Sequence, residues 1–508
     1  SFAAALPMLL HMSFPSVWRV LALLALTLLV APLAEAQTAA LRGFVSDASD
    51  GQPLIGATVL VVEVNARGER VGEPRGAAAD LDGLYVISRL SPARYAIQAS
   101  FIGYATQIDT LTLESGVRGY DVSLQPADAT LGVAVVESER TTGGARVTAG
   151  VQSIDPADIE LIPTPDVSGD LASYLTTTPG VVTTGDRGGQ LFIRGGEPSQ
   201  NLVLLDGMAV YQPFHVLGFY SAFPSALLAG ADLYAGGYPA RFGGQVSSVL
   251  DIQSRTGNKQ QLAAQGSVAP FVSAAQVEGH LVKGVVSFLG SARVSVVEQG
   301  AARIVDQDLP YDFGDLFGKV HANVTPTSQL SVTGLRTWDR GTIGEDTGGL
   351  VPEEVRYTNT AVGLRFLYLP SVSPLRAEIL ANVSELDSEQ GVREMDGQRP
   401  SRQSAVGRLS FEANLTSYLG ATDLNYGGFV RTNRLRSSLS TFAAETSQFY
   451  TEAGAYVEPE VRIGGLSVQG GLRIHSFPND GRTYLEPRAK MVFDSGIHQI
   501  SAAGGSYH

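Results

Sequence analysis

The strongest constraint on the fold is a two-residue alternation of apolar and polar side chains that recurs through residues 259–508. It is clearest from Ala405 to Leu415, where odd-numbered residues are apolar or small and even-numbered residues are mostly polar. Successive side chains of a β-strand point to opposite faces, so each such strand has one apolar and one wet face. The pattern recurs at Leu316–Val324, Ala377–Val383 and Leu466–His475. Both a membrane-spanning β-barrel and a one-sided soluble sheet produce this alternation.

The amino terminus has the pattern of an export signal. After Met12 come one positive residue, Arg19, an apolar core from Val20 to Val30, and the small-x-small tripeptide Ala34–Ala36. That core is about 11 residues long, whereas a helix that spans a bilayer needs about 20, which favours a cleaved signal over an anchor. We therefore expect residues 1–36 to be removed, translation to start at Met12, and the mature chain to begin near Gln37.

Composition excludes several classes of protein. The chain has no cysteine, which excludes a disulfide scaffold and thiolate metal sites. Its formal net charge is −14 and it has no basic run, so it lacks the positive stripe that a nucleic-acid binder needs. The histidines show no H-E-x-x-H pairing, and no P-loop or G-x-S-x-G elbow is present, so we expect no catalytic residue, metal or cofactor.

Two passages join β-type apolar runs to glycine pairs and an arginine. Arg194 precedes Gly195 and Gly196, and Arg241 is followed by Gly243 and Gly244. Glycine allows one backbone to approach another closely, and a buried arginine needs a carboxylate to offset its desolvation.

These passages resemble the plug domain of TonB-dependent outer-membrane receptors. The resemblance is carried by Pro179–Gly180, the IRG element at 193–195, LLDG at 204–207 and ARFGG at 240–244. It implies a mixed α/β plug over residues 147–258 inside a barrel that starts at 259, and a transporter in place of an enzyme. Local signals predict short helices after Asp155 and from Gly169 to Thr176.

Residues 37–125 predict a small β-sandwich of short strands separated by Asp-Gly and other glycine turns. The turn at Asp82–Gly83, followed by Tyr85, resembles the carboxypeptidase regulatory-like domain. That resemblance implies no catalytic residue here. A carbohydrate- or protein-binding module and a spacer that organises the receptor both remain open.

Residues 126–146 predict an extended linker. Its short β-prone run lies where the receptor family keeps its TonB box, and an exposed strand can recruit a partner by β-augmentation. The run is Val133, Ala134, Val135, Val136, Glu137 and Ser138. The alternative is that this run forms the last strand of the sandwich.

The predicted fold class is mainly β: signal peptide, small β-sandwich, α/β plug and a transmembrane antiparallel barrel. We count about 11–12 barrel strands, whereas plugged transporters of this kind have about 22. The resemblance therefore implies that the C-terminal part of the barrel is missing.

Within this frame, candidate site residues follow from their neighbours. Glu378 and Glu412 lie on the polar faces of barrel strands and are the predicted partners of Arg194 and Arg241. Asp206 and Gly207 predict a turn with Asp206 accepting backbone hydrogen bonds. An aromatic cluster follows, and the resemblance places it at the outward-facing plug apex, where it either contacts a ligand or packs against the barrel. Its members are Tyr211, Phe214, His215, Phe219 and Tyr220.

The resemblance implies a receptor that imports a scarce ligand, a ferric siderophore or a glycan or peptide, across the outer membrane. TonB and its inner-membrane complex would supply the energy, outer-membrane lipid would surround the barrel, and the N-terminal domain would lie in the periplasm. A surface lipoprotein is a further partner that the resemblance allows. The alternative from another class is a secreted multidomain β-sandwich adhesin or binding protein without a pore.

Overall fold

The computed structural model describes most of the chain after residue 38. The described residues are 39–127, 150–162, 169–183, 191–215, 220–269, 271–296, 312–343, 353–371, 373–392, 401–419, 422–439, 444–495 and 498–508. The predicted export signal and TonB box lie outside these residues.

The N-terminal domain is a β-sandwich of two four-stranded sheets. One sheet has the order β4-β1-β7 with β8 also paired to β1, and the other has the order β3-β2-β5-β6. Apolar residues from both sheets, including Leu41, Val59 and Ile97, form one closed core. The strands are β1 Ala39–Asp47, β2 Thr58–Glu63, β3 Arg75–Ala78, β4 Leu84–Leu90, β5 Ala93–Ser100, β6 Gln107–Leu113, β7 Gly116–Gly119 and β8 Val122–Leu124.

The plug is a small α/β unit around a five-stranded sheet of order β13-β12-β15-β14-β9, with a separate β10-β11 pair. β12 runs parallel to β15, and the other pairs are antiparallel. The predicted helices are confirmed: Asp155 caps α3 and Asp170 caps α4. The elements are β9 Val151–Ile154, α3 Pro156–Glu160, α4 Leu171–Thr177, β10 Val181–Thr183, β11 Leu191–Ile193, η1 Pro198–Gln200, β12 Asn201–Leu205, β13 Met208–Ala209, η2 Ser225–Leu227, β14 Leu228–Tyr234 and β15 Ser248–Ser254.

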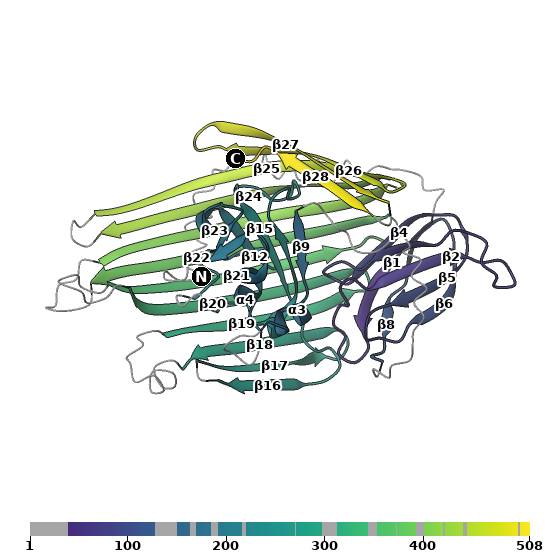
Figure 1. Cartoon of the computed structure of the whole chain (residues 1–508), viewed down its shortest axis with the longest axis horizontal. Coiled ribbons are helices and arrows are strands. Elements are labelled where there is room, and N and C mark those ends of the chain that lie inside the picture. The colour runs from purple at the N-terminus through teal and green to yellow at the C-terminus, as the bar shows by residue number, and fades with distance from the viewer. Residues whose placement is uncertain are drawn as a thin grey trace.

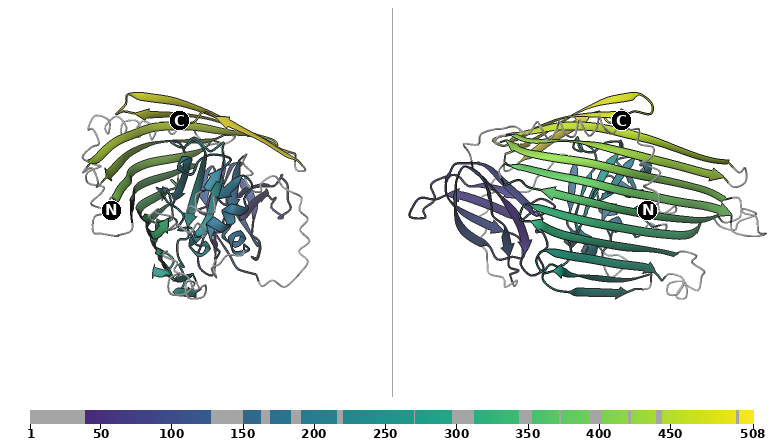
Figure 2. Two further views of the ribbon diagram at one scale, coloured as in Figure 1. Left: turned by 60° about the vertical axis from the view of Figure 1, so that its left-hand side comes forward. Right: turned by 180° about the vertical axis from the view of Figure 1, so that it is seen from behind.

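A single antiparallel sheet of 13 strands, β16 to β28 in chain order, forms a curved wall around the plug (Figures 1 and 2). The strands are β16 Ala263–Val268, β17 Val272–Val282, β18 Val286–Ser295, β19 Asp312–Thr325, β20 Ser328–Ile343, β21 Glu353–Tyr368, β22 Leu375–Val392, β23 Ser401–Leu419, β24 Thr422–Leu439, β25 Ala444–Ile463, β26 Leu466–Phe477, β27 Arg482–Asp494 and β28 Gln499–Gly505. Our count from the pattern was too low, because turns such as the two residues between β19 and β20 hardly interrupt the alternation.

The wall confirms the predicted alternation. Its polar face points inward: Glu378, Asn382 and Arg473 are buried between wall and plug. Its apolar face points outward, and Ile379 and Leu472 are 48% and 38% exposed. Large apolar side chains are exposed in this way on most wall strands, which suits an outer face in contact with lipid. No helix among the described residues has the length and hydropathy needed to cross a membrane.

The two ends of the wall differ in the length of their connections. At one end, β19–β20 and β25–β26 are joined by two residues each, whereas at the other end β18–β19 and β20–β21 are joined by 16 and nine residues. The N-terminal domain lies at the short-turn end, beside the plug (Figure 1).

Candidate functional site: the plug and wall interface

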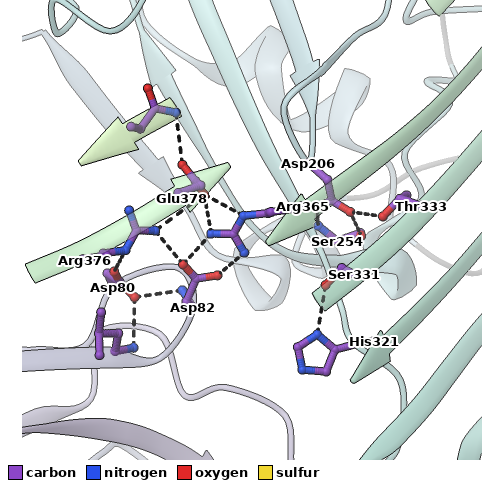
Figure 3. Close-up of polar contacts among 12 residues, drawn as sticks. Asp80, Asp82, Asp206, Ser254, His321, Ser331, Thr333, Arg365, Arg376 and Glu378 are labelled. Carbon is purple, nitrogen blue, oxygen red and sulfur yellow. Dashed lines mark hydrogen bonds and ion pairs between the residues drawn. The ribbon is translucent and has the colours of Figure 1, made fainter. Parts of the chain in front are cut away.

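The LLDG element joins the plug sheet to the middle of the wall. Asp206 follows β12 with φ +48° and Gly207 has φ +83°, so the pair makes the tight turn into β13. The Asp206 carboxylate accepts the Ser254 backbone N–H, as predicted, and a bond from Thr333 Oγ1 of the wall at 2.8 Å (Figure 3). It also accepts a bond from a second wall side chain, Lys319, whose Nζ lies 3.0 Å away. Burial by itself would raise the pKa of Asp206, but Lys319 and Ser254 hold it below its usual value.

The wall approaches this turn closely. Asn382 Nδ2 donates to the Gly207 carbonyl at 2.9 Å, and a Cβ on Gly207 would lie 2.9 Å from a Leu380 methyl. Glycine is therefore required here by both the positive φ and the neighbouring wall.

The ARFGG loop is held by arginines of the wall. Arg473 donates to the carbonyls of Ala240 and Arg241 at 3.0 and 3.1 Å, and Arg488 donates to the Phe242 carbonyl at 2.8 Å. A Cβ on Gly243 would lie 2.5 Å from the Arg473 guanidinium, so glycine makes room for the clamp. Gly244 has φ +80° and faces Glu452 and His475 of the wall.

The prediction that Glu378 and Glu412 pair with Arg194 and Arg241 across the interface is wrong. Arg241 pairs within the plug, with Asp251 at 2.5 Å. Glu378 pairs with Arg365 of the wall, and Glu412 pairs with Arg431 of the wall. Both glutamates face inward as predicted, but each holds a wall arginine; Arg431 in turn reaches the Gly243 carbonyl at 3.5 Å.

Arg194 forms no ion pair among the described residues, and its side chain is exposed. Its backbone, at φ +50°, and Gly195, at φ +81°, make a turn after β11 in which Arg194 N–H donates to the Gly180 carbonyl at 2.8 Å. Gly196 lies against Ser247, where a side chain would overlap the Ser247 hydroxyl. Residues 193–196 therefore act through their backbone, which forms the turn. The Arg194 side chain makes no ion pair among the described residues.

The aromatic cluster packs against the wall. Phe214 and Tyr220 are buried, Tyr211 is half-buried, and Phe219 lies outside the described residues. Tyr220 and Phe313 of the wall have ring centroids 5.4 Å apart. Of the two alternatives, ligand contact and packing against the barrel, the geometry supports packing. The described members of the cluster form no open surface for a ligand.

His215 joins this cluster to two carboxylates that the sequence reasoning missed. Its Nε2 lies 2.8 Å from Asp315 and its Nδ1 lies 2.9 Å from Asp339, and all three side chains are buried. The alternation could have identified both carboxylates, because Asp315 and Asp339 occupy inward-facing positions of β19 and β20.

Arg293 completes this network toward the long-loop end of the wall. It pairs with Asp315 of the wall at 2.6 Å and with Asp170, the cap of α4, at 3.2 Å. It also donates to the Ser221 carbonyl of the plug. Plug and wall are therefore joined by charged, hydrogen-bonded contacts at three levels: Arg293 and His215, Asp206, and the ARFGG loop.

The attachment through His215 should depend on pH. Burial by itself would lower the pKa of His215, but Asp315 and Asp339 overcome it and raise the pKa from 6.5 to about 9. A raised histidine pKa contributes stability that is complete below about pH 6.5 and is lost as pH rises through about 9, here about 3 kcal/mol.

We expect plug release in urea to need less denaturant at pH 9.5 than at pH 6.5. Because the chain has no cysteine, Ala240→Cys provides a single thiol at the plug–wall interface, where Ala240 is fully buried, and its labelling reports release; each sample is brought to a common pH for labelling. A His215→Gln variant should show a flatter pH profile; an equal slope in both proteins would contradict the assignment.

A curved sheet wall that is apolar outside and polar inside, with a small α/β unit held against its inner face, defines a partial β-barrel with a plug. Residues 40–125 match the family described as "Carboxypeptidase regulatory-like domain", and residues 144–249 match the family described as "TonB-dependent Receptor Plug Domain". The chain therefore has the domains and fold of a TonB-dependent receptor with an N-terminal regulatory-like domain.

Solved structures of such receptors have the same fold. The siderophore receptor PirA from Acinetobacter baumannii matches with a TM-score of 0.56 and 16% identity over 70% of this chain and 60% of its own. The outer membrane transporter YddB from Escherichia coli matches with a TM-score of 0.55 and 14% identity over 71% and 61%. The FrpB iron transporter from Neisseria meningitidis matches with a TM-score of 0.54 and 15% identity over 70% and 64%. The chain thus spans less than two thirds of the length of these receptors, and no curated protein sequence matches it.

Proposed function

We propose that this chain belongs to an outer-membrane transporter that imports a scarce ligand with energy delivered by TonB. The observation that carries the proposal is the kind of contact between plug and wall. Part of the interface is apolar, where Leu289, Phe317, Leu335 and Ala361 of the wall join the plug core. Elsewhere the contacts are ion pairs and hydrogen bonds, such as Lys319 with Asp206 and Arg473 with the ARFGG carbonyls. Water can replace such contacts when they are pulled apart, whereas a continuous apolar core would resist separation. A plug held in this way is suited to displacement by a pulling partner.

The outer face of the wall supports a membrane location. Soluble monomers rarely expose large contiguous apolar patches, yet Val332, Leu364 and Ile379 are exposed on three successive wall strands, β20, β21 and β22. This observation counts against a secreted adhesin without a pore. In barrels of this class the short turns face the periplasm, so the N-terminal domain would lie there.

For the cargo we propose only a chemical class of ligand. PirA is described as a siderophore receptor and FrpB as an iron transporter, so a ferric siderophore is the first ligand to test. A glycan or peptide is the second, since a regulatory-like domain precedes the plug. A surface lipoprotein would be a partner in the second case.

The function is tested by deleting residues 133–138 in the full-length receptor. TonB is proposed to pair with this segment by β-augmentation, so we expect uptake and growth on a panel of ferric siderophores as sole iron source to be lost, with outer-membrane fractionation and siderophore binding unchanged. A matched deletion of residues 141–146, farther along the same linker, should leave growth intact. Undiminished growth of the 133–138 deletion would refute TonB coupling through this segment, and loss of binding as well would show that the segment is structural.

A further inference from the structure

The N-terminal domain is fastened to the short-turn end of the wall by a buried arginine. Arg42 of β1 is 6% exposed and donates to four carbonyls around the β21–β22 turn. The shortest of these bonds reach Pro370 and Leu369, at 2.5 and 2.7 Å. A guanidinium that serves only backbone carbonyls outside its own domain is a docking contact, because it contributes nothing to the sandwich core.

A second contact is made by the β3–β4 turn. Asp82 receives two parallel bonds from Arg365 of β21, at 2.6 and 2.7 Å, and a third from Arg376 of β22 at 2.9 Å (Figure 3). Glu378 of β22 shares Arg365 at 2.6 Å. Asp80 also lies 4.0 Å from Arg376, so three carboxylates surround two guanidinium groups, and the N-terminal domain supplies Asp80 and Asp82.

The turn is built so that Asp82 is available for this role. Asp80, and not Asp82, makes the turn, because its carboxylate accepts the backbone N–H groups of Asp82 and Leu84 at 2.9 Å each. Every hydrogen bond recorded for the Asp82 carboxylate goes to the wall. Burial by itself would raise the pKa of Asp82, but Arg365 and Arg376 hold it well below its usual value.

A third contact reaches the end of the plug. Gln52 donates to the Gly257 carbonyl at 2.5 Å and accepts the Thr256 N–H at 3.1 Å, and Lys259 N–H donates to the Asp50 carbonyl at 2.7 Å. The N-terminal domain therefore contacts both the wall and the plug at the same end of the molecule.

These contacts border a partly open polar cavity of about 240 Å³ between the three parts of the chain. Its lining includes Phe44 and Pro53 of the N-terminal domain, Lys259 after the plug, and His321 and Ser331 of the wall. The cavity adjoins the Asp206 turn, since Ser254 and Lys319 also line it. We call this cavity the vestibule.

We propose that the N-terminal domain is a releasable gate, latched by Asp82 and Arg42, that closes the vestibule beneath the plug at the short-turn end. The latch is releasable because Arg365 and Arg376 remain paired with Glu378 after the N-terminal domain moves away, and water can then solvate both guanidinium groups. The closure itself is independent of transport; only its purpose, to control the exit of imported ligand, rests on the proposed function.

The gate is tested by the accessibility of a single thiol in the vestibule of the purified full-length protein. Ser331→Cys places a small thiol in the vestibule wall at a position that is 6% exposed. A charged methanethiosulfonate reagent should label it slowly in the parent background. With Asp82→Asn, which keeps the shape but removes the charge, the rate should rise about tenfold or more, as expected when a buried ion pair is broken.

Arg42→Gln provides an independent variant at the other latch and should act in the same direction. Asp109→Asn is the matched control, because Asp109 is an exposed carboxylate of the same domain that bonds Tyr120. Acceleration in both latch variants but not in the control supports the gate. Unchanged labelling in Asp82→Asn and Arg42→Gln, or equal acceleration in the control, overturns it. Neither ligand nor TonB is needed, so this result is separate from that of the 133–138 deletion.

Discussion

The Arg293→Met variant is expected to release its plug at a much lower urea concentration than the parent, with the free energy of plug release reduced by about 3–5 kcal/mol. Arg293 is 1% exposed and pairs with Asp170 of the plug and Asp315 of the wall. Methionine keeps much of the side-chain volume but leaves Asp170 without its cation. His215 still neutralises Asp315, so the larger part of the cost should arise at the cap of α4.

The measurement is urea-dependent labelling of the Ala240→Cys reporter at the plug–wall interface. Arg340→Met is the matched control, since Arg340 also lies on a wall strand but its side chain is 60% exposed and pairs only with Glu354 among the described residues. We expect Arg340→Met to stay within about 0.5 kcal/mol of the parent. If both variants lowered the midpoint equally, the wall itself would be weakened and the bridge to the plug would not be the cause.

The alternation predicted the wall well because it is a local signal. In the alternation at Leu316–Val324, Leu316 and Val320 fall on one face and Lys319 and His321 on the other; the first two are 47% and 44% exposed, and the last two are buried. A period of two fixes which face each side chain occupies without any knowledge of its neighbours. The same reasoning placed Glu378 and Glu412 correctly on the inner face.

Partners across the interface could not be predicted in the same way. We assumed plug arginines and wall glutamates, whereas the wall supplies Arg473 and Arg488 and the plug offers backbone carbonyls. A carbonyl acceptor leaves no trace in the sequence, since every residue carries one. Only the glycines indicated a close contact at these positions. They did not indicate which group of the wall makes the contact.

The contacts that dock the N-terminal domain on the wall also could not be predicted from the sequence. Asp82 was interpreted as a turn residue, and the turn does form, but through Asp80. The second aspartate of the motif is then free to bind Arg365, a residue 283 positions away. Such a pairing depends on how three folded parts meet, and no local pattern contains that information.

Lys319→Met is the other variant with a large expected effect, and it can be corrected by a second substitution. Lys319 Nζ binds Asp206 at 3.0 Å, and both side chains are buried. Removing the cation leaves a buried carboxylate with only Ser254 and Thr333 as donors, which should cost about 3–5 kcal/mol of plug attachment.

Adding Asp206→Asn should recover most of this loss, because the amide carries no charge: its oxygen can still accept the Ser254 N–H, and its NH2 group can donate to the Ser254 and Thr333 hydroxyls. Asp206→Asn alone leaves Lys319 unpaired and should also be costly, so the double variant is expected to be more stable than either single one. Lys283→Met, in the exposed β17–β18 turn, is the matched control and should be neutral. Additive losses in the double variant would mean that the two residues act separately, and the LLDG turn would then not be fastened to the wall by charge. Recovery would identify this pair as a central charged link between the plug and the wall.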